Sequence, residues 1–200
     1  SLYVTKAERP VRALTFRYSG IAKEELVAAR QVAERAGVVE HRFIRLPDLR
    51  EASDIPGFSL RNRPPTYIPM KNGIFYSFAA AYAEETGSAF IVGGHNRDDL
   101  EVFDDVSPRF FGALQRAMLQ SSPILRENKV RIVRPLGDKR KSEVVRLARS
   151  LGVPLELSWS CHRDGHEHCW KCEGCRSRMK AFHEAGVPDP LVSTRRAKIT

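Results

Sequence analysis

All four cysteines of this chain lie in one short C-terminal segment, and this clustering constrains the fold more than any other feature. They are Cys161, Cys169, Cys172 and Cys175. The compact CxxCxxC run lets one tight backbone turn direct three sulfurs at one point, and four thiolates suit a tetrahedral Zn²⁺. Because four ligands leave no position open for water or substrate, the pattern predicts one structural zinc ion per chain.

Other uses of these cysteines stay open at this point. Two disulfides, or unbound thiols, are one alternative, although a disulfide needs Cα atoms about 5.5 Å apart and such close spacing pairs poorly. An iron–sulfur cluster also takes four cysteines, but the charged neighbours predict a wet rim. The loop between the ligands holds His162, His166 and His168. They could replace a cysteine, but with four sulfurs present we expect them to face solvent.

The length of 200 residues suits one domain with a full core and a small appendage. No apolar run approaches the roughly 18–20 residues of a membrane span, and we expect no secretion signal. Clustered thiols without such a signal are typical of a reducing compartment, so we expect a cytoplasmic protein.

The formal net charge of +9 favours polyanions, which include nucleic acids and nucleotide phosphates. The basic residues are scattered in small clusters, and such runs usually form a solvated face. We therefore do not expect nucleic acid to be the main partner. Residues 193–200 read as a basic tail.

Short apolar runs alternate with helical patterns along the chain, and this alternation predicts a parallel sheet with helices on both faces. The expected strands cover residues 12–18, 41–46, 89–92 and 130–133. The expected helices cover residues 22–36, 72–86, 108–119, 139–151 and 175–185. Residues 48–66 read as a long loop, and long loops in compact domains are often functional. Four strands are few for such a sheet, and the chain reads as though it starts in mid-domain.

Ligands of open α/β sheets bind outside the carboxyl ends of the strands. One such end carries Gly93-Gly94-His95-Asn96-Arg97-Asp98-Asp99, where Gly94 lets the backbone approach a ligand and Asn96 and Asp99 offer an amide and a carboxylate. A helix-capping loop is the alternative. The acidic stretch from Asp98 to Asp105 could help to hold Mg²⁺ for a nucleotide. A solvated face is the alternative, which we favour for Asp98, Glu101 and Asp104.

The expected helix at residues 72–86 begins beside Lys71 and Asn72. A helix N-terminus favours anions, so these residues could lie near a ligand. Asn72 could instead be simply the N-cap of the helix. Lys141 lies near another helix start, where it could contact a phosphate or a carboxylate or simply be a surface lysine.

Several segments together resemble the 7-cyano-7-deazaguanine synthase family, within the PP-loop ATP pyrophosphatase superfamily. They are YIPMKNGIFYSFAAAYAEETG, GGHNRDDLEVFDDVSPRFF, RPLGDKRKSEVVRLARSLGVPLELSWSC and CWKCEGCRSRMKAFHEAGVPDPL. The terminal part is the most specific, and in this family its four cysteines bind zinc. The resemblance covers almost the whole chain. Ser107, Asp104 and Phe103 depart from the family's usual arginine, proline and tyrosine, which leaves substrate contacts there in doubt.

The resemblance implies a Rossmann-like fold of the adenine nucleotide α-hydrolase type, with a small zinc-binding helical appendage. The implied division is a nucleotide-binding domain at residues 1–155, a zinc subdomain at 156–192 and the tail at 193–200. The family's ATP-binding loop, SGGxDS, is not found in the chain. We expect an N-terminal truncation that lacks this loop and the first strand, so that these residues alone would be inactive.

The resemblance implies a ligase that uses ATP, with Mg²⁺, and ammonia to convert 7-carboxy-7-deazaguanine into 7-cyano-7-deazaguanine, a queuosine or archaeosine precursor. It also admits a homodimer. We assign catalytic roles to Asn96, Asp99 and Lys141, and binding roles to Phe16, near the adenine, and to Asn72, Gly94 and Asp105. Two rivals remain: another PP-loop enzyme that modifies tRNA, and a non-catalytic zinc-stabilised relative.

Overall fold

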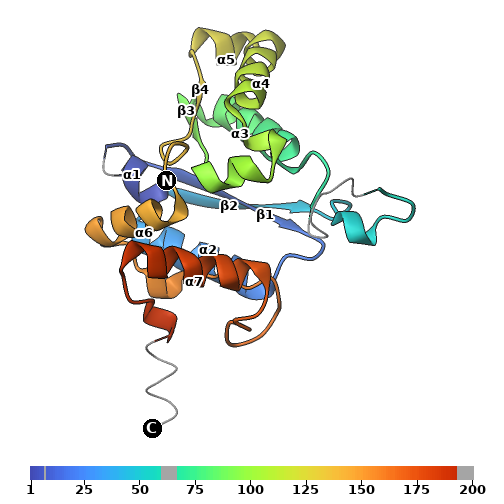
Figure 1. Cartoon of the computed structure of the whole chain (residues 1–200). Helices are drawn as coiled ribbons and strands as arrows, with labels where there is room; N and C mark the ends of the chain where they lie inside the picture. Colours follow the sequence, from blue (N-terminus) through green and yellow to red (C-terminus); the bar gives the residue numbers. More distant parts are fainter. Residues whose placement is uncertain (7, 60–66, 193–200) are drawn as a thin grey trace. The chain divides into compact units, whose positions relative to one another are not determined.

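The computed structural model describes residues 1–6, 8–59 and 67–192 (Figure 1). Its contacts divide the chain into two compact units. The first comprises Ser1, Tyr18–Gly20 and Arg45–Asp138, and the second comprises Leu2–Arg17, Ile21–Ile44 and the chain from Lys139 onward. The expected tail at 193–200 and residues 60–66 of the expected loop lie outside the described residues. The domain boundary expected after residue 155 stays a prediction, because the two compact units are divided at other residues.

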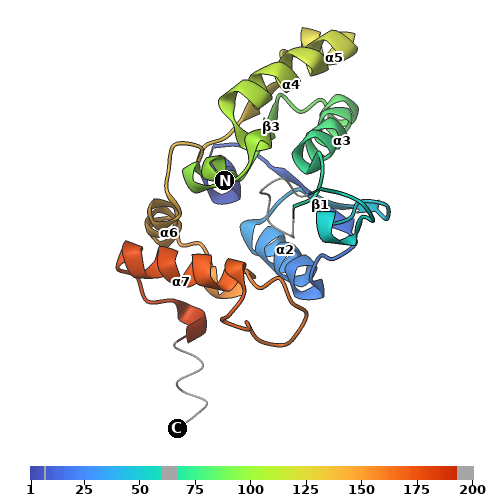
Figure 2. The same ribbon diagram turned by 45° about the vertical axis from the view of Figure 1, so that its right-hand side comes forward.

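The first unit is built around helices that pack on a short parallel strand pair. Strands β3 (Phe90–Val92) and β4 (Arg131–Val133) pair in parallel, with Ile91 opposite Ile132. Figure 2 shows α3 (Lys71–Thr86), α4 (Pro108–Ser121) and α5 (Pro123–Glu127) grouped with β3. The remaining turns are 3₁₀ helices: η1 (Ala52–Asp54), η2 (Arg97–Glu101) and η3 (Asp104–Val106). One apolar cluster, which includes Tyr76, Phe111 and the fully buried Val130, forms the core.

Two helices of this unit begin with the same Ser-Pro pair. Ser107 accepts a hydrogen bond from the Phe110 N–H at the start of α4, and Ser122 accepts one from the Leu125 N–H at the start of α5. Serine is a favoured N-cap, and proline at the first helical position lacks the N–H that would otherwise be unpaired. The short helix α5 was not predicted, although this pair was the signal for it.

The second unit contains all but the last residues of a strand pair, and a packed pair of helices. Strands β1 (Arg12–Tyr18) and β2 (Glu40–Leu46) are neighbours, connected through α2 (Lys23–Ala36), and α1 (Leu2–Lys6) precedes them. In Figure 1, α6 (Lys141–Ser150) and α7 (Glu173–Ala185) lie side by side, and Val145, Ala181 and Phe182 form the core between them. The 3₁₀ helix η4 (Leu155–Leu157) leads into the cysteine segment.

The predicted strands and helices are confirmed to within two residues, but one continuous sheet is not observed. The described strands form two separate pairs, β1 with β2 and β3 with β4. In each pair, a connection that contains helix links the two strands. The residue pattern of a strand predicts which side chains are buried, but it does not predict which strand is the neighbour. None of the described helices is long and apolar enough to span a membrane.

Candidate functional site

The four cysteine sulfurs come together in the second unit. The Sγ atoms of Cys161, Cys169, Cys172 and Cys175 all lie within 4.8 Å of one another. The Cys169–Cys175 and Cys161–Cys172 sulfur pairs are 3.9 Å apart, far beyond the roughly 2.05 Å of a disulfide bond. All four are free thiols, so the disulfide alternative is wrong for this structure. The group could hold one metal ion with four sulfur ligands.

A tight backbone turn aims N–H groups at one of these sulfurs. Trp170 adopts a left-handed conformation, with φ at 58°, and the N–H groups of Lys171 and Cys172 donate to the Cys169 Sγ at 3.5 and 3.3 Å. These two hydrogen bonds lower the pKa of the Cys169 thiol to about 6. Because donors to sulfur stabilise a thiolate, the turn is suited to a metal ligand.

Burial has the opposite effect on the last cysteine. Cys175 lies in the first turn of α7, and burial raises the pKa of its thiol to about 12. A metal ion would therefore have to displace the proton of Cys175 on binding. The neighbouring Gly174 leaves no room for a side chain, because a Cβ there would overlap the carbonyl oxygen of Ser160. Two chain segments thus meet closely around the sulfurs.

The expectation that all three loop histidines face solvent is wrong for His168. His162 and His166 are exposed, but only 7% of His168 is exposed. Its Nε2 accepts a hydrogen bond from the Ser160 N–H at 3.0 Å, and its ring lies 4.3 Å from Trp159 and 5.2 Å from Trp170, centroid to centroid. This burial lowers the pKa of His168. The ring therefore packs the loop from within.

A buried arginine, which sequence reasoning missed, ties α7 to the segment before the cysteines. Arg178 forms a two-pronged ion pair with Asp189, from Nε to Oδ2 at 2.7 Å and from Nη2 to Oδ1 at 2.8 Å. It also donates to the Ser158 Oγ at 2.6 Å and to the Leu155 carbonyl at 3.2 Å. The sequence feature that could have indicated this ion pair is the C-terminal segment that resembles the family, in which Asp189 precedes a proline.

A second group of polar residues lies in the first unit, where β3 and β4 end. The Gly93 N–H donates to the Val133 carbonyl at 2.9 Å and so extends the ladder. A Cβ at Gly93 would overlap the hydroxyl of Tyr76. Tyr76 is buried, and its ring lies 5.9 Å from that of His95 and 4.8 Å from that of Phe111. The Tyr76 hydroxyl has no hydrogen-bond partner among the described residues.

Asn96 and Asp99 form a reciprocal cap at the start of η2. The Asn96 side chain accepts from the Asp98 N–H at 2.9 Å, and Asp99 Oδ2 accepts from the Asn96 N–H at 3.1 Å. The capping alternative for this loop is confirmed. Gly94 is exposed beside it. Two carboxyl-bearing side chains that were expected to be solvated, Glu101 and Asp104, are exposed, whereas Asp98 is half-buried, so the expectation is wrong for Asp98 alone.

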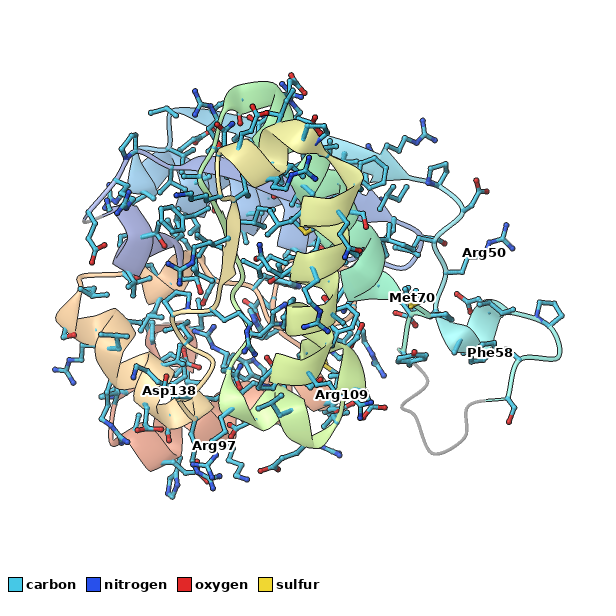
Figure 3. All side chains as sticks on the ribbon, turned by 90° about the horizontal axis from the view of Figure 1, so that it is seen from above. Arg50, Phe58, Met70, Arg97, Arg109 and Asp138 are labelled. Carbon is cyan, nitrogen blue, oxygen red and sulfur yellow. The ribbon has the colours of Figure 1, made fainter. Side chains whose placement is uncertain are left out.

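Asp105 and Asn72 come together at the start of α3. The Asn72 N–H donates to Asp105 Oδ2 at 3.3 Å, and the Asn72 side chain is buried. The N-cap is Met70, an exposed residue with φ at 56° (Figure 3), so the alternative that Asn72 caps this helix is wrong. The Asp105 carboxylate thus serves as the anion at this helix N-terminus.

His95 links these groups electrostatically. Burial lowers the pKa of His95, the carboxylates of Asp99 and Asp105 oppose that shift, and Lys71 and Arg134 add to it. Arg134 lies 4.8 Å from the Phe111 ring and donates to the Val106 carbonyl at 3.0 Å. The strand ends therefore bring together an imidazole, two carboxylates and two cations.

Phe16 and Lys141 belong to the second unit. Phe16 is half-buried in β1. Lys141 starts α6, and its Nζ donates to the Ser177 Oγ of α7 at 3.1 Å. The structure thus brings Asn96 near Asp99 and Asn72 near Asp105 within one unit, and it engages Lys141 with α7. On the surface of the first unit, Arg97 and Arg109 are exposed near η2 and α4 (Figure 3).

The fold and the site define a mixed α/β protein with a cluster of four cysteines that could hold a metal ion. A family model described as "Queuosine biosynthesis protein QueC" matches residues 1–186, and the chain belongs to this family. A 7-cyano-7-deazaguanine synthase from Trichodesmium erythraeum is 34% identical over 96% of this chain and 93% of its own length. The synthases of Thermosynechococcus vestitus and Thermoplasma acidophilum are 37% and 35% identical, over 90% of this chain and 83% and 80% of their own lengths.

Proposed function

We propose that the protein is a 7-cyano-7-deazaguanine synthase, a ligase that makes the nitrile of a queuosine precursor from 7-carboxy-7-deazaguanine, ATP and ammonia. The observation that carries this proposal is the family match over residues 1–186, together with relatives of that name that align over most of both chains. The clustered cysteine sulfurs agree with it.

The chemistry explains why ATP is needed. A carboxylate resists nucleophiles, so its oxygen first attacks the α-phosphorus of ATP, releasing pyrophosphate and forming an acyl adenylate. Ammonia then displaces AMP and loses a proton, which gives the amide. The amide oxygen then attacks the α-phosphorus of a second ATP with release of pyrophosphate, and loss of AMP and of both protons on nitrogen leaves the nitrile. Mg²⁺ accompanies ATP and offsets the charge on its phosphates.

The chain's own residues supply positioning for these steps. Asn96 and Asp99 are assigned a catalytic role, and their mutual cap fixes both side chains at the end of β3. Gly94 offers an exposed backbone beside them, and Asp105 and Asn72 hold the start of α3. In the second unit, Phe16 is assigned to the adenine, and Lys141 to a phosphate or carboxylate. Such fixed polar groups lower a barrier because they need no reorganisation during the reaction.

Zinc is the metal that best fits the cysteine cluster. Four thiolates with this spacing suit a closed tetrahedral site, and the N–H groups directed at Cys169 stabilise its charge. Bound there, zinc would cross-link the chain before Cys161 to the start of α7 and contribute to folding rather than to chemistry.

The two strand pairs are proposed to belong to one parallel sheet of Rossmann-like type. Support comes from the pairs themselves, because each is joined by a helical crossover, as in a doubly wound sheet.

Substitution of Asp99 tests the assigned site. In the intact, zinc-loaded protein, Asp99→Asn keeps an oxygen that can accept from the Asn96 N–H but removes the charge, so we expect nitrile formation to fall by tenfold or more while folding is retained. Asp104→Asn is the matched control, since Asp104 is an exposed acid of the same stretch. Equal activity of the two variants, measured by mass spectrometry of the nitrile, would remove Asp99 from the site.

A further inference from the structure

The ammonia step of the proposed reaction needs a proton acceptor. Ammonia that has bonded to the acyl carbon carries one proton more than the amide product, and a base beside the nitrogen removes it. Ligands of an open α/β sheet bind at the carboxyl ends of the strands, and Asn96 and Asp99 follow the end of β3. A base for this step would therefore lie among the titratable side chains at this end of β3.

His95 lies in the chain between Gly94 and Asn96, and its side chain is half-exposed. Its ring is stacked on the ring of Tyr76, with 28° between the planes and 5.9 Å between the centroids, and lies 5.4 Å from the ring of Phe111. These two contacts fix the plane of the imidazole. Among the residues that the structure describes, no hydrogen bond occupies its ring nitrogens. A ligand at the strand ends can therefore donate to one of them.

Three other titratable side chains around His95 are poorer acceptors. The Tyr76 hydroxyl is buried, and this burial raises the pKa of Tyr76, which keeps the hydroxyl protonated. Asp99 Oδ2 and Asp105 Oδ2 each accept a backbone N–H, at 3.1 and 3.3 Å, and so hold the starts of η2 and α3. Carboxylates are in general weaker bases than imidazole. The imidazole is thus the better acceptor of the group.

The charges around His95 also suit a base. Burial lowers the pKa of His95 below the ordinary value of 6.5, so most of the rings are unprotonated at pH 7. The carboxylates of Asp99 and Asp105 oppose this shift, and they would stabilise the imidazolium that forms when a proton arrives. The cations of Lys71 and Arg134 add to the shift, and they have no acceptor for the proton themselves.

We propose that His95 is the general base of the ammonia step, a catalytic residue beyond those assigned above. The proposal rests on the proposed function. The ammonia nitrogen forms a bond to the acyl carbon, the bond from that carbon to the AMP oxygen breaks with its electron pair, and one proton passes from nitrogen to an imidazole nitrogen. The products are the amide, AMP and an imidazolium that returns its proton to water. The first adenylation needs no base, because the substrate carboxylate already carries the attacking lone pair.

Substitution of His95 separates the two steps. In the intact, zinc-loaded protein, pyrophosphate released from ATP and 7-carboxy-7-deazaguanine without ammonia reports the first adenylation, and amide formed once ammonia is added reports the second step. We expect His95→Gln to release pyrophosphate as the unsubstituted protein does but to form the amide about a hundredfold or more slowly. His41→Gln is the matched control. Burial also lowers the pKa of His41, but this residue lies in β2 of the second unit, so both rates should stay unchanged.

The pH dependence gives a second readout, which a purely structural role would not change. Total ammonium is adjusted at each pH so that free ammonia stays constant. The rate of amide formation by the unsubstituted protein should fall as the pH drops through the pKa of His95, because a protonated ring accepts no proton, and this acidic limb should be absent in His95→Gln. Imidazole added to His95→Ala should restore part of the rate, because it can occupy the vacated space and accept the proton.

The outcomes separate this proposal from the proposed function. If the unsubstituted protein forms the nitrile but shows no acidic limb, or if the limb persists in His95→Gln, His95 is not the base although the activity stands. Equal loss of pyrophosphate release and of amide formation in His95→Gln, without rescue of His95→Ala by imidazole, also overturns the proposal, since the residue would then only support the fold. If the unsubstituted protein releases no pyrophosphate and forms no amide, the proposed function itself fails, and the assignment of the base fails with it.

Discussion

The backbone at Gly93 lies so close to the Tyr76 hydroxyl that there is no space for a side chain. We expect Gly93→Ala to lower the free energy of unfolding by about 1–3 kcal/mol through overpacking. Adding Tyr76→Phe should recover part of the loss, since it removes the overlapping atom. Gly112→Ala is the control, because its Cβ would lie 3.7 Å from the nearest atom, in helix α4. Thermal melting measures all four proteins, and an unrescued double variant would contradict this account.

The buried ion pair between Arg178 and Asp189 is expected to stabilise the fold. Only 5% and 6% of these side chains are exposed, so loss of one partner leaves a buried charge. We expect Arg178→Met to cost about 3–5 kcal/mol of unfolding free energy in denaturant titrations. Lys180→Met is the matched control, since the Lys180–Glu184 pair on the same helix is largely exposed and such pairs contribute roughly 0–1 kcal/mol. Similar losses in both would show that burial does not decide the effect.

The cysteine loop also stabilises another element of its unit. Helix α2 has no side-chain cap of its own at Ala22, and the Lys23 N–H donates instead to Asp164 Oδ1, in the loop between Cys161 and Cys169, at 2.8 Å. The loop has little regular structure, so a bound metal would hold it in place. Order at the start of α2 should therefore depend on the metal.

Chelation of the metal tests this dependence. After zinc removal we expect faster amide hydrogen exchange in the loop and at Lys23, because the ligands lose their cross-link and α2 loses its cap. Amides of α3, in the first unit, are the internal control. Unchanged exchange at the loop after confirmed zinc loss would mean that the metal is not structural.

Prediction from sequence succeeded where the signal is local. The runs at β1 and α2 are bounded by turn residues, and Gly37 ends α2 in the left-handed conformation, as its position predicts. It failed where the answer depends on how a loop folds back on itself. His168 sits in a polar segment, and its burial comes from packing against Trp159 and Trp170 and from its hydrogen bond with Ser160. Likewise the left-handed conformation of Met70, which moves the start of α3, has no local signal.

At the scale of the whole molecule, the cluster of four cysteines was predicted from spacing alone, because all four lie within fifteen consecutive residues. The arrangement of the described strands in two separate pairs was not predicted, because strand pairing depends on segments that lie far apart in the sequence. The net charge of +9 also did not indicate that a cavity of the second unit is lined by three glutamates and, among the described residues, by no lysine or arginine. A global charge thus says little about one site.

The most direct test of the central claim is to incubate the intact, zinc-loaded protein with 7-carboxy-7-deazaguanine, ATP and ¹⁵N-labelled ammonium, and to follow the products by mass spectrometry. The account predicts 7-cyano-7-deazaguanine that carries the labelled nitrogen in its nitrile, with AMP released as each adenylate reacts and no product without ATP. A folded, zinc-loaded protein that forms neither labelled nitrile nor AMP would contradict it.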